Sequence, residues 1–154
     1  MESDCVNCPL GYYCIQGTST ICPAGHYCDG NNSGATIDPK ECPQDTYNLL
    51  EGRQDLNECL PCAAGYYCSD TAIANLEFYK CPKGKYCLND PTQGTLAPAV
   101  DCPNGTYNDE RGIGAEIDCK QCPAGSYCAA GSIYPLKCPS GYYCPAGSDV
   151  PTLC

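Results

Sequence analysis

Eighteen cysteines are the residues of this 154-residue chain whose type and spacing could do chemistry. Six of them form three C-x2-C pairs: Cys5 with Cys8, Cys59 with Cys62, and Cys119 with Cys122. Such pairs occur in zinc sites, in thioredoxin-like redox motifs and in disulfide frameworks. A zinc site needs four ligands, but these pairs lie far apart in the sequence and His26 is the only histidine. A redox motif needs a βαβ context that the sequence lacks. The spacing therefore favours disulfides.

Most cysteines belong to a seven-residue motif, C-x-x-G-x-Y-C, that occurs six times. The copies are CPLGYYC (8–14), CPAGHYC (22–28), CAAGYYC (62–68), CPKGKYC (81–87), CPAGSYC (122–128) and CPSGYYC (138–144). An active site is built once, so repetition at this density indicates a scaffold. Proline after the first cysteine and glycine two residues later predict a type I turn, with proline second and glycine fourth.

A tyrosine precedes the last cysteine of every copy. We expect its ring to lie over the neighbouring disulfide with the hydroxyl in water, which makes these tyrosines the nearest equivalent of a core. They are Tyr13, Tyr27, Tyr67, Tyr86, Tyr127 and Tyr143. Two positions depart from the pattern: Ala63 replaces the turn proline, and Asp45 replaces glycine in the related stretch CPQDTYN. Asp is less costly than most residues at an unusual φ.

The composition explains why a scaffold of this kind would need cross-links. Leu, Ile, Val and Phe number only 21, whereas Gly and Pro number 16 and 14. So few aliphatic residues cannot bury one large core, and frequent Gly and Pro interrupt any helix. We expect a small disulfide-rich fold, mostly irregular with short β-hairpins. It would be an elongated rod of tandem cysteine-rich repeats with little or no helix.

Cysteine content and charge also limit the compartment and the partners. Disulfides persist outside the cytosol, so we expect a secreted, surface or lumenal protein. The sequence has neither a signal peptide nor an apolar stretch that could span a bilayer, which suggests a mature or excised piece of a longer secreted chain. A net charge of −10 argues against nucleic acid and anionic membranes as partners.

The cysteines repeat with a period of six and divide the chain into three cysteine-rich repeats, residues 1–58, 59–118 and 119–154. The last cysteine of a repeat opens a different stretch, CPQDTYNLLEGRQDLNEC (42–59) or CPNGTYNDERGIGAEIDC (102–119). Cys154 stands where a third such stretch should begin. We therefore expect the third repeat to be incomplete and the array to continue.

The C-P-x-G-x-Y motifs, C-x2-C pairs and TYN stretches resemble ephrin-receptor-like cysteine-rich repeats. These belong with the cysteine-rich modules of tumour-necrosis-factor and growth-factor receptors. The resemblance covers residues 5–154. It implies extracellular rods of short β-hairpins and irregular turns, in which a ladder of disulfides replaces a core. Such modules serve as spacers, surface coats or ligand-binding ectodomains.

Disulfide connectivity is not readable from sequence alone, but the spacing makes one scheme economical. A spacing of 16 residues that occurs twice suggests Cys42–Cys59 and Cys102–Cys119. Neighbouring motifs would pair in register, as resemblance to the receptor modules also implies: Cys8–Cys22, Cys14–Cys28, Cys62–Cys81, Cys68–Cys87, Cys122–Cys138 and Cys128–Cys144. The alternative links Cys5 to Cys14 and Cys8 to Cys22. The first scheme leaves Cys5 and Cys154, which would form a disulfide between successive segments or subunits.

The remaining candidate sites are few. Asn31 and Asn104 lie in N-x-S/T sequons and are candidate glycosylation sites. Asp29, Asn31, Ser33 and Gly34 imitate half of an EF-hand loop, but Lys40 stands where a bidentate Glu is needed, so we interpret this stretch as a polar turn. His26 occupies a variable motif position and should face solvent. We expect no catalytic residue, metal site or cofactor, and hence no enzyme.

Two functions remain. The first is an extracellular structural protein, a disulfide-stapled tandem repeat that builds a fibre, stalk or surface coat by head-to-tail self-association or by continuation of the array. The alternative is the ectodomain of a receptor or adhesion protein that binds a protein ligand. Near-identical motifs favour the first, because a binding site usually makes one module diverge.

Overall fold

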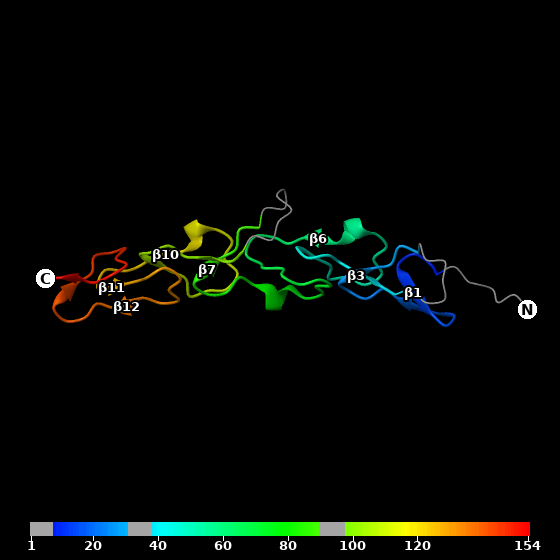
Figure 1. The fold of residues 1–154 in the computed structure, drawn as a ribbon, viewed down its shortest axis with the longest axis horizontal. Helices are drawn as coiled ribbons and strands as arrows, with labels where there is room; N and C mark the ends of the chain where they lie inside the picture. Colours follow the sequence, from blue (N-terminus) through cyan, green and yellow to red (C-terminus); the bar gives the residue numbers. More distant parts are fainter. Residues whose placement is uncertain (1–7, 31–37, 90–97) are drawn as a thin grey trace, which may run out of the picture. The chain divides into compact units, whose positions relative to one another are not determined.

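The computed structural model describes residues 8–30, 38–89 and 98–154, and Figure 1 shows its fold. The chain forms two compact units, Met1–Cys62 with Cys68–Phe78, and Ala63–Tyr67 with Tyr79–Cys154. The boundary between these units does not coincide with a boundary of the three six-cysteine repeats. The repeats are therefore periods of the sequence and not the compact units of the fold. The expected rod concerns how the two units are arranged and remains a prediction.

Short antiparallel hairpins supply nearly all the regular structure of the described residues. Fourteen strands form seven two-stranded sheets, together with three 3-10 turns and no α-helix in the described ranges. The elements are β1 (Tyr12–Ile15), β2 (Thr18–Ile21), β3 (His26–Tyr27), β4 (Lys40–Glu41), β5 (Thr46–Tyr47), η1 (Leu56–Glu58), β6 (Leu60–Pro61), η2 (Leu76–Tyr79), β7 (Lys85–Tyr86), β8 (Val100–Asp101), β9 (Thr106–Tyr107), η3 (Glu116–Asp118), β10 (Lys120–Gln121), β11 (Ser126–Tyr127), β12 (Leu136–Lys137), β13 (Tyr142–Tyr143) and β14 (Thr152–Leu153). The expectation of a disulfide-rich, mostly irregular fold with short hairpins is confirmed.

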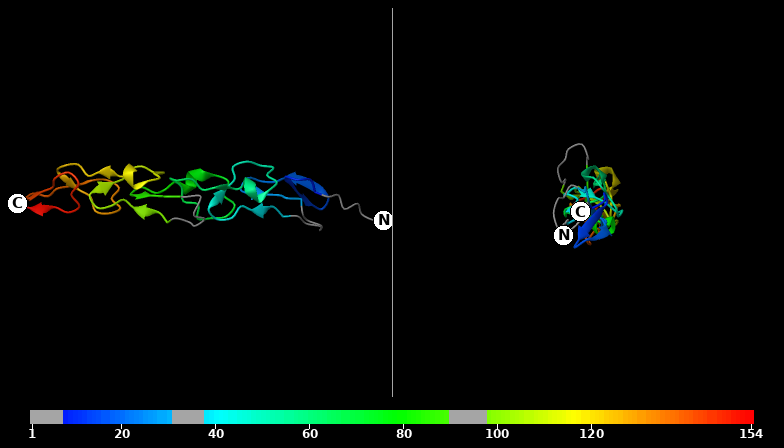
Figure 2. Two further views of the ribbon diagram at one scale, coloured as in Figure 1. Left: turned by 90° about the horizontal axis from the view of Figure 1, so that it is seen from above. Right: turned by 90° about the vertical axis from the view of Figure 1, so that its right-hand side faces the viewer.

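Each hairpin joins one motif to the next. The two residues before a motif's last position pair with the two residues that precede the next motif or TYN stretch, as in β3 with β4 and β11 with β12. Figure 2 shows these hairpins from two further directions. The segment between the two strands can vary in length without disturbing the pairing, which explains why the spacings between motifs differ.

The turn inside the motif differs from the expected type I turn. The N–H of Tyr12 donates to the carbonyl oxygen of Pro9 at 3.1 Å, so proline is the first turn residue and Gly11 the third. Gly11 has φ +78°, the left-handed value that a type II turn requires at that position. Proline is not essential in the first position: at Ala63 the same bond forms, from Tyr66 N–H at 3.2 Å. Asp45 adopts φ +65°, the unusual φ that we expected aspartate to tolerate.

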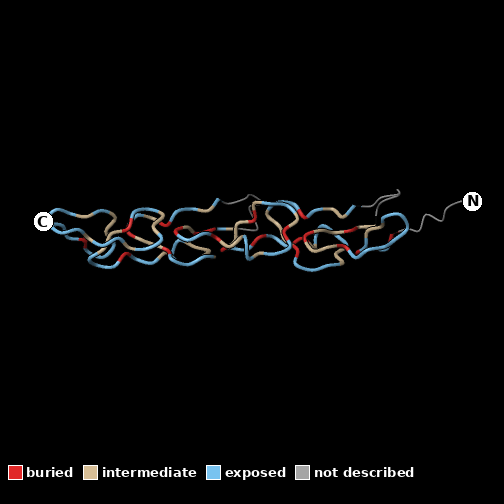
Figure 3. The backbone as a smooth tube through the Cα atoms, turned by 90° about the horizontal axis from the view of Figure 1, so that it is seen from below, coloured by how far each residue is buried: buried red, intermediate tan, exposed pale blue. Residues whose placement is uncertain are grey.

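Cysteines, and not tyrosines, form most of the buried interior. Fifteen apolar side chains are buried among the described residues, and 13 of them are cysteines; the others are Ile73 and Tyr86. The buried residues occur at separate points along the backbone, as Figure 3 shows. Of the six expected core tyrosines, Tyr86 is buried, Tyr143 is 54% exposed, and the other four are half-buried. The disulfides therefore take the place of an aliphatic core.

Candidate functional site

Eight disulfides give the described residues their covalent framework. Six close a single motif: Cys8–Cys14, Cys22–Cys28, Cys62–Cys68, Cys81–Cys87, Cys122–Cys128 and Cys138–Cys144. The other two, Cys42–Cys59 and Cys102–Cys119, confirm the pairs expected from the constant spacing. The six in-register pairs, Cys8–Cys22 and Cys14–Cys28 among them, are wrong, and so is the alternative, because Cys8 and Cys14 bond to each other.

The turn geometry explains the local pairing. A type II turn over residues 9–12 reverses the chain inside the first motif. The reversal brings the Cα atoms of Cys8 and Cys14 to 5.8 Å, within the usual range for a disulfide. All six motif disulfides have the same sequence separation of 6. Each motif is therefore a closed loop in its own right.

The two TYN stretches contain the same loop, with asparagine in place of the last cysteine. We expected them to differ, but the motif turn recurs in both, from Thr46 N–H to Pro43 O at 3.2 Å in the first. Asn108 is fully buried; its amide donates to Lys85 O at 3.1 Å and Glu110 O at 2.9 Å, and its Oδ1 accepts from Glu110 N–H at 2.9 Å. Hydrogen bonds thus replace the disulfide. The first cysteine is free to close the longer loop, as in Cys102–Cys119.

The buried asparagine gives a testable effect on stability. Asn108→Ala should lower the free energy of unfolding by about 2–4 kcal/mol, because it removes three hydrogen bonds that the buried Asn108 side chain makes with the backbone of Lys85 and Glu110. Denaturant unfolding of the oxidised protein measures the change. Asn104→Ala, at an exposed position of the same motif, is the control and should cost about 1 kcal/mol or less. Equal effects of the two substitutions would contradict this role of Asn108.

Successive loops are joined by a recurring pair of backbone hydrogen bonds. In each motif or TYN stretch, the residue at the glycine position, which is Asp45 in one case, donates to the last residue of the next such loop and accepts from its first cysteine. For Gly84 the bonds are Gly84 N–H to Asn108 O at 2.8 Å and Cys102 N–H to Gly84 O at 2.9 Å. Gly84 also lies against Gly131, in the segment that follows the motif of residues 122–128. A Cβ on Gly84 would collide with the carbonyl oxygen of Gly131.

The other candidate residues have structural partners. In the C-x2-C pairs, Cys59, Cys62, Cys119 and Cys122 each bond to a cysteine outside the pair. No cluster of three or more His, Cys, Asp or Glu in the described ranges could hold a metal ion. Asp29 forms an ion pair with Lys40 at 2.5 Å, while Asn31, Ser33 and Gly34 lie outside the described residues. His26 is half-buried, less exposed than we expected, with Nδ1 3.2 Å from Ala24 O.

The structure describes one of the two sequons and one of the two terminal cysteines. Asn104 is exposed, and its Oδ1 accepts from Ala130 N–H at 2.9 Å. Asn31 and Cys5 lie outside the described residues. Cys154 has an exposed, unpaired thiol, and its N–H donates to Gly141 O at 3.1 Å. Its backbone therefore makes the bond that the first cysteine of other motifs makes.

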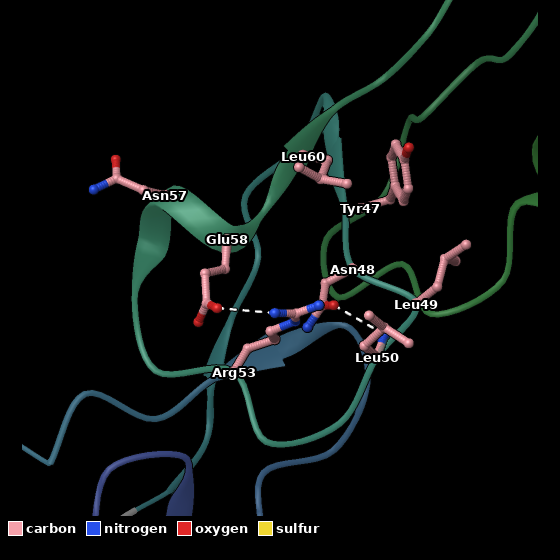
Figure 4. A pocket seen from close by; sticks show the side chains of 8 residues that line it. All are labelled: Tyr47, Asn48, Leu49, Leu50, Arg53, Asn57, Glu58 and Leu60. Atoms are coloured by element: carbon pink, nitrogen blue, oxygen red, sulfur yellow. Dashed lines mark hydrogen bonds and ion pairs between the residues drawn. The ribbon is translucent and has the colours of Figure 1, made fainter.

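An apolar pocket lies in the first unit and was not expected from the sequence. It has a volume of about 470 Å³. Its lining consists of Tyr47, Asn48, Leu49, Leu50, Arg53, Asn57, Glu58 and Leu60. In Figure 4 the leucines and the tyrosine ring surround the space, while Arg53 and Glu58 pair at one side, Nη1 to Oε1 at 2.9 Å. A hydrogen bond from Gln54 N–H, together with those from Arg53 and Asp55 N–H, lowers the pKa of Glu58.

Comparisons with known proteins leave the chain without an assigned family. No protein-family model matches it, and no curated protein is significantly similar to it in sequence. The eight disulfides are typical of proteins that fold in an oxidising environment. Within the described part of the chain, no helix has the length and apolar character needed to cross a bilayer.

Proposed function

We propose that this chain is an extracellular structural protein, a disulfide-stapled tandem repeat that contributes to a fibre, stalk or surface coat. The recurrence of one loop carries the proposal. Eight loops have the same turn: six are motifs closed by their own disulfide, and two are TYN stretches with a buried asparagine in place of the last cysteine. Each loop joins the next through the same backbone hydrogen bonds, so the arrangement can be lengthened by adding loops. This property suits a spacer.

The resemblance to ephrin-receptor-like and tumour-necrosis-factor-receptor-like repeats supports the same assignment, because such modules serve as extracellular spacers. It also supports a second candidate, a ligand-binding ectodomain. The apolar pocket near Arg53 favours this second candidate, because a pure spacer has no use for a pocket on one loop. Glycans on Asn31 and Asn104 would suit either function.

Electron microscopy of the cells that make this protein distinguishes the two. Gold-labelled antibodies raised against the chain should mark a continuous coat or filament outside the plasma membrane. Label confined to separate spots on the membrane would favour a receptor and contradict the structural role. Label inside the cytoplasm would contradict both.

The exposed thiol of Cys154 gives the proposed head-to-tail assembly a direct test. We expect it to form a disulfide with Cys5 of the next copy, so the purified chain should give a ladder of multimers on a non-reducing gel after mild oxidation. Cys154→Ser should remove every species larger than a dimer, because each chain then has only Cys5 available. A ladder that is unchanged in this variant would contradict the assignment.

A further inference from the structure

The loop that forms the pocket occurs twice in the chain, with leucines in one copy and charged residues at the same positions in the other. Residues 49–60, here called the leucine loop, correspond to residues 109–120, the charged loop. Both follow the buried asparagine of a TYN stretch, both are closed by a disulfide of sequence separation 17, and both contain a 3-10 turn. Equivalent hydrogen bonds fix them: Gly52 N–H donates to Cys22 O and Gly112 N–H to Cys81 O, each at 2.8 Å. The two backbones are therefore equivalent.

At three matching positions a leucine of one loop is replaced by a charged residue in the other. Leu49, Leu50 and Leu60 of the leucine loop correspond to Asp109, Glu110 and Lys120 of the charged loop. In the charged loop, Lys120 Nζ lies 2.7 Å from Asp109 and 3.0 Å from Glu110, and these carboxylates raise the pKa of Lys120. The charged loop shows that this backbone folds without the leucines.

The leucines are exposed, as are many large apolar side chains of the described residues, but these three line one pocket. Leu49, Leu50 and Leu60 are 48%, 57% and 49% exposed, and they surround a pocket of about 470 Å³. Contiguous exposed apolar side chains in a chain so poor in aliphatic residues indicate a binding surface. Because the loop does not need them to fold, their contribution must come from burial against something else.

The charges near the pocket indicate what that partner carries. The leucine loop contains three carboxylates, of Glu51, Asp55 and Glu58, and one cation, Arg53, which is already paired with Glu58. The loop is thus acidic around an apolar centre. At this acidic loop, a second copy of the chain, with its net charge of −10, would be repelled, whereas a basic partner would be attracted; the proposed head-to-tail disulfide uses Cys5 and Cys154 instead.

We infer that the leucine loop binds a segment of another protein that places one leucine-sized apolar side chain in the pocket, beside a lysine or arginine. The apolar side chain would contact the three leucines and Tyr47. The cation would lie near Glu51 or Asp55. This function goes beyond that of a repeating spacer, because it uses one loop and leaves its counterpart unused.

Methyl NMR of the whole oxidised chain tests the inference with a defined probe, acetyl-Lys-Lys-Leu-Lys-Lys-amide. We expect saturable shifts of the Leu49, Leu50 and Leu60 methyl signals at millimolar peptide. The same peptide with Ser or Glu tests each part of the recognition: Ser for Leu removes the apolar side chain, and Glu for Lys reverses the charge. Both should weaken binding at least about tenfold.

The charged loop supplies the matching variant. Leu49→Asp with Leu50→Glu and Leu60→Lys transplants its side chains and should also weaken binding at least about tenfold. Leu88→Asp, at a leucine that is 49% exposed outside the loop, should leave binding unchanged. The peptide series on the unaltered protein gives a result even if the triple variant fails to fold.

Three results would overturn the inference. The first is no methyl shift with peptide up to about 5 mM, and the second is equal shifts with any of the altered peptides. The third is a change in the leucine-loop methyl signals on raising the protein concentration without peptide, which would assign the loop to self-association.

Discussion

Complete reduction should abolish the folded structure of this protein at room temperature. By the loop-entropy model, each short motif disulfide stabilises the fold by about 2 kcal/mol, and each long one, such as Cys42–Cys59, by about 3 kcal/mol. Eight such contributions exceed the roughly 5–15 kcal/mol that stabilises a typical domain. The aliphatic residues cannot compensate, because Ile73 is the only one buried among the described residues.

Circular dichroism and amide NMR measure the effect. The reduced and alkylated chain should show no melting transition and collapsed amide dispersion, whereas the oxidised chain treated with the same alkylating reagent should keep both. A dispersed amide spectrum after full reduction would show that hairpins and turns hold the fold without cross-links, against this account.

Gly84→Ala should lower the free energy of unfolding by at least about 3 kcal/mol. Gly84 has φ +77°, where a Cβ alone costs about 1–2 kcal/mol. The added Cβ would also collide with the carbonyl oxygen of Gly131, a backbone atom of a residue whose N–H is held by Cys102 O at 2.9 Å. Denaturant unfolding of the oxidised protein gives the value.

Gly125→Ala is the matched control. Gly125 has φ +84° and the same two backbone bonds, to Cys144 O and from Cys138 N–H, but no described atom lies within 4 Å of a Cβ built there. It should lose only the 1–2 kcal/mol of backbone strain, on the order expected for any L residue at this φ. If the two substitutions cost the same, the close packing of Gly84 contributes nothing.

Composition was sufficient to predict the class of fold. The shortage of aliphatic residues, with frequent Gly and Pro, correctly indicated short hairpins in a cross-linked chain. The TYN stretches held a signal that was missed: CPNGTYN shares its Cys, Pro, Gly and Tyr positions with CPAGSYC and has Asn in place of the last Cys, and the two form the same loop. Asparagine can replace cysteine there because its amide bonds the backbone groups of the neighbouring loop, as Asn108 does with Lys85.

The pairing of the motif cysteines was predicted wrongly for a physical reason. Two similar motifs in succession satisfy the spacing whether their cysteines pair within or between motifs. The turn decides between these, and its type depends on glycine at positive φ in the third position, not the fourth. Gly11, with φ +78°, closes the chain on itself and brings Cys8 to Cys14.

The pocket could not be predicted because its residues are not a motif. Leu49, Leu50 and Leu60 are unremarkable in sequence, and only the fold brings Leu60 across from Tyr47 in the β5–β6 pair. A comparison of residues 49–60 with 109–120 would have shown the exchange of apolar for charged residues. It would not have shown that they share one surface.

Tryptic mapping without reduction tests the central claim, that each motif closes on itself. Trypsin cleaves after Lys120 and Lys137, which separates the motif of residues 122–128 from that of residues 138–144. From the monomeric chain, in which Cys154 is a free thiol, we expect two separate peptides, 121–137 and 138–154, each two hydrogens lighter than its reduced form because it contains its own disulfide. A single product in which the two peptides remain joined until reduction would show pairing between motifs and contradict the account.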